Sequence, residues 1–362
     1  MKVRFGKDGP LVTRLGFGGI PIQTIPYEDA VEVVRYAYER GIRLFDTARG
    51  YTTSERIIGE ALAGVREDVF IATKSGAKTV EKISEHFQQS LDNLGTDYVD
   101  LFMFHNIMTE DDLHKILAPG GPFDYMKQQQ KLGRARIVGF SSHSVETSVL
   151  AVGKRVFASV QFPFNYLETQ CVKRLLPDAL EAGMGFMVMK PFAGGALSSA
   201  SAALKWVCSQ NISTVIPGMM SKHEIDTAVE SALLVEAELG QVEPSTDVQL
   251  IEPPLTDEER LAMRQDITEL SQNFCRRCQY CLPCPNGIPV NFIVSGELFF
   301  KRAGWHRADQ AQVERIKKGL ECVECGVCEA RCPYLLPLST MVRPMAERLL
   351  DKISQLKQAS TE

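Results

Sequence analysis

Eight of the ten cysteines in this 362-residue chain gather in two short motifs toward its C-terminal end. The second motif, C-x2-C-x2-C-x3-C-P, places its cysteines at Cys322, Cys325, Cys328 and Cys332. The first motif is one residue shorter before its last cysteine, with Cys275, Cys278, Cys281 and Cys284. Three thiolates at this spacing can bind one face of a cubane, so the motifs predict [4Fe–4S] clusters and one-electron chemistry.

Zinc is the alternative metal for closely spaced cysteines. Two C-x2-C pairs can hold Zn²⁺ tetrahedrally, but zinc explains neither the cysteine triplets nor the Cys-Pro pair that ends each motif. Disulfides are disfavoured, because thiols in the cytosol are kept reduced. The other two cysteines, Cys171 and Cys208, are isolated in helix-patterned segments, and we expect ordinary core or surface residues there.

A second set of residues has the chemistry for proton transfer, namely Asp46, Tyr51, Lys74 and His105. A tyrosine titrates near 10 in water, and a nearby ammonium lowers that pKa toward the range of a useful acid. A carboxylate keeps the lysine charged and oriented, and a neutral histidine can donate a hydrogen bond to a carbonyl. Any one of these residues alone is more often structural or solvated. Their joint occurrence, each beside a short apolar run, predicts a proton-transfer site.

An alternating chain pattern would position these four residues. From residue 13 to about residue 240, short β-branched or aromatic runs alternate with amphipathic, helix-patterned segments. The expected strands are Arg14–Gly18, Arg43–Ala48, Val69–Lys74, Val99–His105, Arg136–Ser142, Phe157–Phe162, Gly185–Pro191 and Thr214–Pro217. Eight such units predict a (β/α)8 TIM barrel, whose chemistry collects at the C-terminal strand ends. A doubly wound sheet shows the same alternation, but polar residues at three consecutive strand ends favour the barrel.

The alternation of strand-like and helix-like segments stops after Gly240. The residues that follow have a different pattern. We expect the barrel over residues 1–240, a proline-containing linker over 241–256, a small, mostly helical iron–sulfur domain over 257–345 and a C-terminal tail over 346–362. Residues 257–272 form an amphipathic helical pattern, with Thr256 as its expected N-cap.

The overall composition is that of an ordinary globular protein, with 44% hydrophobic residues, 23% charged residues and a net charge of −5. There is no basic stripe to meet phosphates, so we expect no nucleic-acid partner. No apolar run reaches the length of a membrane span, and residues 1–6 carry no signal-peptide pattern. We therefore expect a cytoplasmic protein with no membrane partner.

The proton-transfer residues lie in segments that resemble the aldo-keto reductase superfamily. Residues 45–55 (FDTARGYTTSE) are similar to its signature, and 71–74 (IATK) and 100–105 (DLFMFH) match two further catalytic segments. The resemblance covers roughly residues 3–239 and implies a catalytic tetrad of Asp46, Tyr51, Lys74 and His105. It also implies a small carbonyl substrate. Thr52 stands where the family usually has glycine.

The same resemblance implies a nicotinamide cofactor, either NADP or NAD. It assigns cofactor binding to Ser141, Ser142, Gln161, Met189, Lys190, Pro217, Gly218, Met219 and Lys222. Ser142 replaces the asparagine of the family pattern, and Met189 replaces an aromatic residue common there. Met220 and Glu224 occupy places where arginine is common, so the sequence does not choose between NADH and NADPH.

The cysteine motifs resemble those of two-cluster ferredoxins, and the long insert between them is similar to α-helical ferredoxins fused to redox enzymes. Two-cluster ferredoxins exchange their fourth ligands. The resemblance therefore implies one cluster on Cys275, Cys278, Cys281 and Cys332, and another on Cys322, Cys325, Cys328 and Cys284.

Three functions follow from these features. The first is a nicotinamide-dependent reductase coupled to a one-electron carrier, such as a ferredoxin or a flavin carrier. The second is an ordinary reductase whose clusters are structural or redox-sensory. The third is a nicotinamide-sensing module without turnover, against which the complete tetrad argues.

Overall fold

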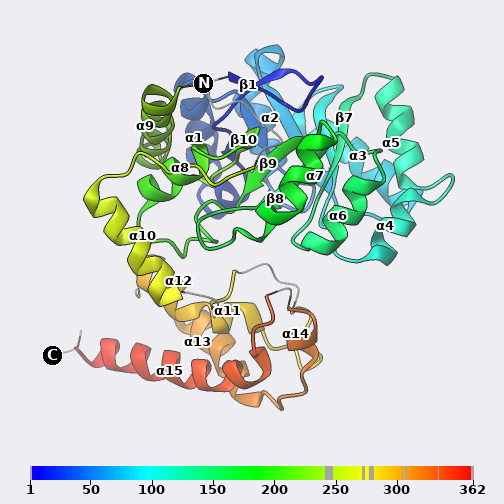
Figure 1. The fold of residues 1–362 in the computed structure, drawn as a ribbon. Helices are drawn as coiled ribbons and strands as arrows, with labels where there is room; N and C mark the ends of the chain where they lie inside the picture. Colours follow the sequence, from blue (N-terminus) through cyan, green and yellow to red (C-terminus); the bar gives the residue numbers. More distant parts are fainter. Residues whose placement is uncertain are drawn as a thin grey trace. The chain divides into compact units, whose positions relative to one another are not determined.

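A computed structural model of the chain describes residues 2–240, 248–270, 274–276, 281–303, 305, 308–332 and 334–359. The chain forms two compact units (Figure 1). The first unit comprises Met1–Phe192 and Ser198–Met263, and the second comprises Ala193–Leu197 and Arg264–Glu362.

The first unit is built around one eight-stranded parallel sheet with its strands in sequence order (Figure 1). The strands are β3 (Phe17–Gly18), β4 (Leu44–Asp46), β5 (Phe70–Ser75), β6 (Val99–Phe104), β7 (Ala135–Ser141), β8 (Ser159–Pro163), β9 (Gly185–Met189) and β10 (Thr214–Val215). Parallel bridges from Leu15 to Val215 and from Gly18 to Gly218 close the sheet. A Cβ on Gly18 would lie 2.7 Å from the Ile216 carbonyl oxygen, so glycine permits this closure. The predicted (β/α)8 barrel is confirmed.

Helices follow the strands and surround them (Figure 1). They are α1 (Tyr27–Glu39), α2 (Ser54–Leu62), α3 (Val80–Leu94), α4 (Glu110–Leu117), α5 (Pro122–Lys131), α6 (Val145–Gly153), α7 (Leu175–Glu181), α8 (Ala200–Cys208) and α9 (Lys222–Leu239). Short 3-10 turns add η1 (Pro21–Thr24), η2 (Ala63–Asp68) and η3 (Gln170–Lys173). Threonine or serine side chains cap several helices, and Gly95 ends α3 with a left-handed φ of 61°.

A two-stranded antiparallel hairpin, β1 (Lys2–Arg4) with β2 (Leu11–Thr13), precedes the barrel. Its side chains Val3, Phe5 and Val12 are buried with apolar residues of the barrel strands, among them Leu44 and Phe70. Because these two barrel residues begin their strands, the hairpin covers the N-terminal end of the barrel, opposite the ends that carry the polar residues.

The second unit is mostly helical, as the sequence predicts. Its elements after α10 (Asp257–Leu270), which crosses the boundary between the units, are α11 (Val290–Val294), α12 (Gly296–Ala303), α13 (Gln310–Lys317), η5 (Lys318–Glu321), α14 (Val327–Ala330) and α15 (Leu338–Ala359). Its apolar core includes Ile293, Phe300 and Ile316, all essentially inaccessible to solvent. Cysteines of both motifs pack into this same core.

The C-terminal end differs from the expected tail over residues 346–362. Helix α15 continues to Ala359, and its side chains Val342, Ala346, Leu349 and Ile353 are buried in the core of the second unit. These four residues recur every three or four positions, which places them on one face of a helix. The polar residues between these four made the segment resemble an exposed tail in the sequence.

The two cysteine motifs are followed by the same backbone turn. Gly287 N donates to Cys284 O at 2.9 Å, and Leu335 N donates to Cys332 O at 3.1 Å. Both turn residues have left-handed backbones, with φ of 66° and 52°. A helix begins three residues later in each case, α11 in the first copy and α15 in the second. The structure therefore repeats the cysteine-motif segment, with leucine in the second copy where the first has glycine.

Candidate active site and cysteine motifs

Asp46 and Lys74 form a buried ion pair at the C-terminal ends of the neighbouring strands β4 and β5. Lys74 Nζ donates to Asp46 Oδ1 at 2.8 Å, to Asp46 Oδ2 at 2.6 Å and to Thr47 O at 2.7 Å. Burial alone would lower the pKa of Lys74, but Asp46 and Tyr51 outweigh it and hold the pKa above its usual value. Lys74 is therefore a fixed ammonium ion at the centre of the predicted tetrad.

Tyr51 lies on the connection from β4 to α2, with its ring centroid 5.0 Å from Lys74 Nζ. Burial raises the pKa of Tyr51, and Lys74 opposes that rise without cancelling it. The nearby ammonium predicts a pKa below 10, but the net direction is the opposite because burial is the larger effect. The phenol is consequently protonated at neutral pH, which is the form that a general acid requires.

His105 follows β6, the strand beside β5, and its ring stands edge-on to that of Tyr51. The two ring centroids are 5.8 Å apart and the ring planes meet at 84°. Burial, followed by the Lys74 charge, lowers the pKa of His105 to about 3. The imidazole is thus neutral at physiological pH, and a neutral imidazole still carries one N–H donor. The structure brings all four predicted tetrad residues together at the C-terminal ends of three adjacent strands.

Gln161, on β8, connects the tetrad to the predicted cofactor site. Its Nε2 donates to Asp46 Oδ1 at 2.9 Å and lies 3.2 Å from Met187 Sδ. Its Oε1 is buried and has no hydrogen-bond partner among the residues that the structure describes. A buried amide oxygen without a donor is costly. Gln161 therefore fits a ligand that brings an N–H group, such as a nicotinamide carboxamide.

The two serines predicted to bind the cofactor differ in what they can offer. Ser141 Oγ accepts a hydrogen bond from Asn106 N at 2.9 Å, which leaves its hydroxyl proton for donation. Ser142 Oγ donates to Ile107 O at 2.6 Å and accepts from Ser144 N at 3.0 Å. Ser142 thus stabilises the loop after β7, and one lone pair of its hydroxyl oxygen remains to accept a hydrogen bond from a ligand.

Met189 is the last residue of β9 and Lys190 follows it, and the resemblance places cofactor contacts at both. Lys190 has a left-handed backbone, with φ of 55°, and its carbonyl oxygen accepts a hydrogen bond from Asn165 Nδ2 at 3.0 Å. Asn165 is fully buried, and its Oδ1 accepts from Leu167 N at 2.9 Å. A non-glycine residue with positive φ is uncommon and is held by its surroundings. Asn165 provides that support.

The loop after β10 carries the remaining predicted cofactor residues, Pro217, Gly218, Met219 and Lys222. Pro217 O accepts from Gly18 N at 2.8 Å, and Met219 is buried. Lys222 is 59% exposed and its Nζ lies 3.8 Å from a Glu32 carboxylate oxygen. Glu224 Oε2 accepts from Met220 N at 2.6 Å, which places a carboxylate at the N-terminus of α9. This carboxylate would repel a phosphate, so the loop is a weak site for a 2′-phosphate.

His143 is a further residue of this region, and it is not among the predicted site residues. It follows β7 by two residues, and its pKa lies well below the usual value because of burial, then the charge of Lys190 and the presence of His105. The electrostatic influence of those two residues places His143 near the mouth of the barrel. Its position directly after Ser142, at a strand end, was the available signal.

The cysteines of the second unit are mostly inside its core. Cys281, Cys322, Cys328 and Cys332 are buried, Cys275 and Cys284 are partly buried, and Cys325 is exposed. Cys278 lies outside the residues that the structure describes.

Two observations, one electrostatic and one a hydrogen bond, bear on the expected exchange of fourth ligands. Burial raises the pKa of Cys328, and Cys322 and Cys284 raise it further, so Cys284 lies near the second motif. In addition, Arg331 Nη1 donates to Pro283 O at 2.9 Å, which joins the ends of the two motifs. Both observations agree with a cluster held by the second triplet together with Cys284.

The described side chains include no group of three His, Cys, Asp or Glu residues arranged to hold a metal ion. The first motif is described without Cys278, so its ligand set is incomplete here. The donor chemistry nevertheless fits iron–sulfur clusters, because thiolates within one small core are soft ligands in a low-dielectric environment. The cluster core itself would draw these sulfurs into their final geometry.

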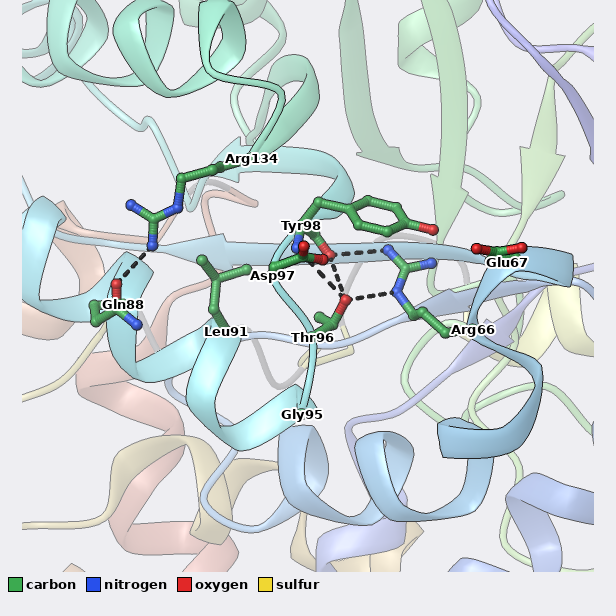
Figure 2. Close-up of a pocket in the computed structure, with 9 residues that line it drawn as sticks. All are labelled: Arg66, Glu67, Gln88, Leu91, Gly95, Thr96, Asp97, Tyr98 and Arg134. Atoms are coloured by element: carbon green, nitrogen blue, oxygen red, sulfur yellow. Dashed lines mark hydrogen bonds between the residues drawn. The ribbon is translucent and has the colours of Figure 1, made fainter.

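A hollow of about 620 Å³ lies at the other end of the barrel strands (Figure 2). Its cations are already engaged, since Arg66 donates to Thr96 Oγ1 and Tyr98 O, and Arg134 donates to Gln88 Oε1. Tyr98 directly precedes β6, on the face of a barrel where polar networks serve stability rather than catalysis. This hollow is therefore separate from the candidate active site.

The family assignment agrees with this geometry. Residues 14–202 match the aldo/keto reductase family, and residues 274–337 match a 4Fe-4S dicluster domain. The first match covers more than half of the chain, and the chain belongs to the aldo/keto reductase family. Its 4Fe-4S dicluster domain follows the barrel in the chain.

The chain is also similar to curated proteins. The chain is 28% identical over 213 residues to L-galactose dehydrogenase of Arabidopsis thaliana, covering 53% of this chain and 66% of that protein. It is 30% identical over 164 residues to an aldo-keto reductase of Bacillus subtilis, covering 41% of this chain and 48% of that protein. The chain thus spans about half to two-thirds of the length of these curated relatives.

Solved structures show the same fold. An aldo-keto reductase from Bacillus halodurans in its holo form superposes with a TM-score of 0.59 at 22% identity, covering 73% of this chain and 95% of that chain. An aldo-keto reductase from Klebsiella pneumoniae in complex with NADPH gives a TM-score of 0.57 at 18% identity, covering 69% of this chain and 99% of that chain. Among the helices that the structure describes, none has the length and apolar character needed to cross a bilayer.

Proposed function

We propose that this oxidoreductase reduces a small carbonyl compound with NADH or NADPH, using Asp46, Tyr51, Lys74 and His105. We further propose that its eight motif cysteines hold two [4Fe–4S] clusters, which exchange single electrons with a carrier such as a ferredoxin or a flavin protein. The observation that supports the first part is the buried Asp46–Lys74 pair beside a protonated Tyr51 and a neutral His105.

Each tetrad residue has a distinct task in this proposal. The neutral His105 donates a hydrogen bond to the substrate carbonyl oxygen and orients it. Tyr51 donates its phenolic proton to that oxygen as negative charge develops there. Lys74 stabilises the phenolate that remains, and Asp46 holds Lys74 charged and pointed at Tyr51. A bound nicotinamide would supply the hydride.

Two groups support nicotinamide binding beside the tetrad. The unpartnered Oε1 of Gln161 would accept an N–H of a carboxamide, and the hydroxyl of Ser141 would donate to its oxygen. Ser141 and Gln161 are paired on the neighbouring strands β7 and β8, and Gln161 also donates to the tetrad residue Asp46. The ratio of kcat/KM for NADH and NADPH would decide between the two cofactors. We expect the larger value for NADH, because the Glu224 carboxylate at the N-terminus of α9 would repel the 2′-phosphate of NADPH.

The test of this proposal is Tyr51→Phe. The variant should lose carbonyl reduction by about 10²–10⁴-fold, because the proton donor is gone. It should still bind the nicotinamide, measured by protein fluorescence quenching. Tyr98→Phe is the matched control, since Tyr98 lies at the opposite strand ends, and it should reduce carbonyls at the normal rate (Figure 2). Undiminished turnover by Tyr51→Phe would exclude Tyr51 as the acid.

A structural role for the clusters is the second candidate, and one observation favours it. Cys281, Cys322, Cys328 and Cys332 are buried within the apolar core of the second unit rather than on its surface. A metal core at that position would hold the unit together, as structural metals do in other small domains.

The two candidates differ when the anaerobic holoprotein is mixed with NADH or NADPH. Bleaching of the cluster absorbance would show electron exchange between nicotinamide and clusters. An unchanged absorbance, with normal carbonyl reduction by the same sample, would favour the structural role.

A further inference from the structure

The residue that follows the proposed acid has an unfavourable backbone conformation. Thr52 comes directly after Tyr51 and adopts a φ of 35°, in the left-handed region. A β-branched residue rarely adopts positive φ, and such strain persists only where neighbouring contacts hold it. The backbone is fixed on both sides, since Tyr51 N donates to Ala48 O at 2.9 Å and Ser54 N donates to Tyr51 O at 2.7 Å. The left-handed Thr52 is thus part of the turn that carries Tyr51.

A side-chain hydrogen bond holds Thr52 in this conformation. The Thr52 hydroxyl donates to Gln23 Oε1 at 2.7 Å, and Gln23 Nε2 donates to Ile20 O at 2.8 Å. The second bond fixes which way the amide of Gln23 faces, so that its oxygen is the group that meets Thr52. Without this acceptor Thr52 could relax toward negative φ. That rotation would turn the peptide group that Thr52 shares with Tyr51.

Gln23 belongs to η1, which is supported by the loop after β10. Thr24 Oγ1 donates to Pro21 O at 2.7 Å and also lies 3.4 Å from Met220 Sδ. A Cβ on Gly218 would lie 2.9 Å from Pro21 Cγ, so glycine at this position lets η1 approach the loop. These contacts fix η1 from the side opposite to its bond with Thr52. Gln23 is therefore offered to Thr52 from a rigid support.

We infer that Gln23 and Thr52 are positioning residues for Tyr51. The hydrogen bond between them holds the left-handed turn, and the turn sets the direction of the phenol. The ring centroid of Tyr51 lies 5.0 Å from Lys74 Nζ and 5.8 Å from the ring centroid of His105, and a small displacement from this arrangement would slow proton transfer. Glycine, which the family usually has at this position, adopts positive φ without such a partner. This inference rests on Tyr51 being the acid of the proposed function.

The first test needs no substrate. Because the ring of Tyr51 stands edge-on to that of His105, its NMR resonance in protein carrying isotope-labelled tyrosine depends on how the two rings lie. The resonance is identified by its absence from Tyr51→Phe. Thr52→Val keeps the shape of threonine without its hydroxyl and should displace the resonance, as should Gln23→Leu. Thr52→Ser keeps the hydroxyl and should leave the resonance in place.

Steady-state reduction of benzaldehyde with NADH is the second test. Thr52→Val and Gln23→Leu should each lower kcat by about threefold to tenfold, the range for loss of one hydrogen bond, with little change in KM. The double variant should be no slower than either single variant, because both changes remove the same bond. Thr52→Ser should restore most of kcat. Thr53→Val is the matched control, since the Thr53 side chain makes no capping hydrogen bond to α2, and it should keep the normal kcat.

The outcomes separate this inference from the proposed function. An unmoved Tyr51 resonance in both Thr52→Val and Gln23→Leu would overturn the inference, as would equal losses of kcat in Thr52→Val and Thr53→Val. If Tyr51→Phe loses turnover while Thr52→Val keeps it, the inference alone fails. Full turnover by Tyr51→Phe would instead refute the proposed acid and, with it, the inference. If Thr52→Val does not fold, Gln23→Leu decides, because it changes a partly exposed side chain on a different element.

Discussion

The two functional regions of this chain differ in how much of their geometry the polypeptide provides. In the barrel, Lys74 is held by three hydrogen bonds of 2.6–2.8 Å within a buried site. In the second unit, cysteines pack into an apolar core, and the described side chains form no group ready to hold a metal ion. The barrel site is organised before any ligand binds, whereas under the proposed function the cysteine unit would take its final shape around its clusters. Substitutions in the two regions should therefore affect stability and activity differently.

Lys74→Met should have the largest effect and should act on the barrel alone. It leaves the Asp46 carboxylate buried without its cation, which should lower the free energy of unfolding by about 3–5 kcal/mol. It should also reduce carbonyl reduction by about 10²–10⁴-fold. Urea unfolding and steady-state kinetics would measure both effects. The control Lys82→Met removes an exposed lysine paired with Glu85 and should change stability by less than about 1 kcal/mol.

The double variant Cys322→Ala, Cys325→Ala should act on the second unit alone. Hydrogen exchange should become fast in α13 and α15, because the metal core that closes their packing is absent. Exchange in the barrel strands should stay slow. Cys171→Ala, in the barrel, is the control and should leave α15 protected. If α15 kept full protection from hydrogen exchange without the two cysteines, the second unit would not need a metal core to fold.

The pH dependence should also distinguish the barrel site. The pKa of His105 is about 3 in the fold and about 6.5 in the unfolded chain. Between these values only the unfolded chain binds the proton, so stability should fall as the pH drops below about 6.5. The contribution of this residue is about 1.4 kcal/mol per pH unit. Urea unfolding at pH 7, 6 and 5 should show a shallower fall for His105→Gln. An equal fall would show that His105 is not buried as a neutral ring.

The smallest expected effect concerns the turn that the two cysteine motifs share. Leu335 adopts a φ of 52° and is 88% exposed, so its side chain gains little to offset the left-handed backbone. Leu335→Gly should therefore stabilise the second unit by about 1 kcal/mol. Gly287→Leu should destabilise it by a similar amount at the equivalent turn. Thermal unfolding of the second unit, with its clusters bound, would measure both changes. A destabilised Leu335→Gly or a stabilised Gly287→Leu would contradict this account.

The barrel and its tetrad could be predicted from the sequence because the patterns that indicate them are local and repeated. Each strand carries its own apolar run, and Asp46, Lys74 and His105 directly end or follow successive runs. The parallel arrangement then brings those ends together. The N-terminal hairpin was missed, because strands of three residues are too short to show alternation.

The remaining differences depend on contacts between distant residues. The net pKa direction of Tyr51 reflects the depth of its burial, which no local pattern encodes. The use of Ser142 within the chain depends on the Ile107 carbonyl, 35 residues away. Arg276 was visible within the first cysteine motif, but its burial between Phe274 and Tyr334 was not.

The burial of Lys74 also has a consequence for chemical reactivity. Acylating reagents attack the neutral amine of a lysine, and both exposure and a low pKa favour that form. Lys74 is 1% exposed, its ammonium is held by three acceptors, and its pKa is raised. Lys74 should therefore escape non-enzymatic acetylation under conditions that modify surface lysines such as Lys82. The protein should then keep its activity after its surface lysines have been acetylated.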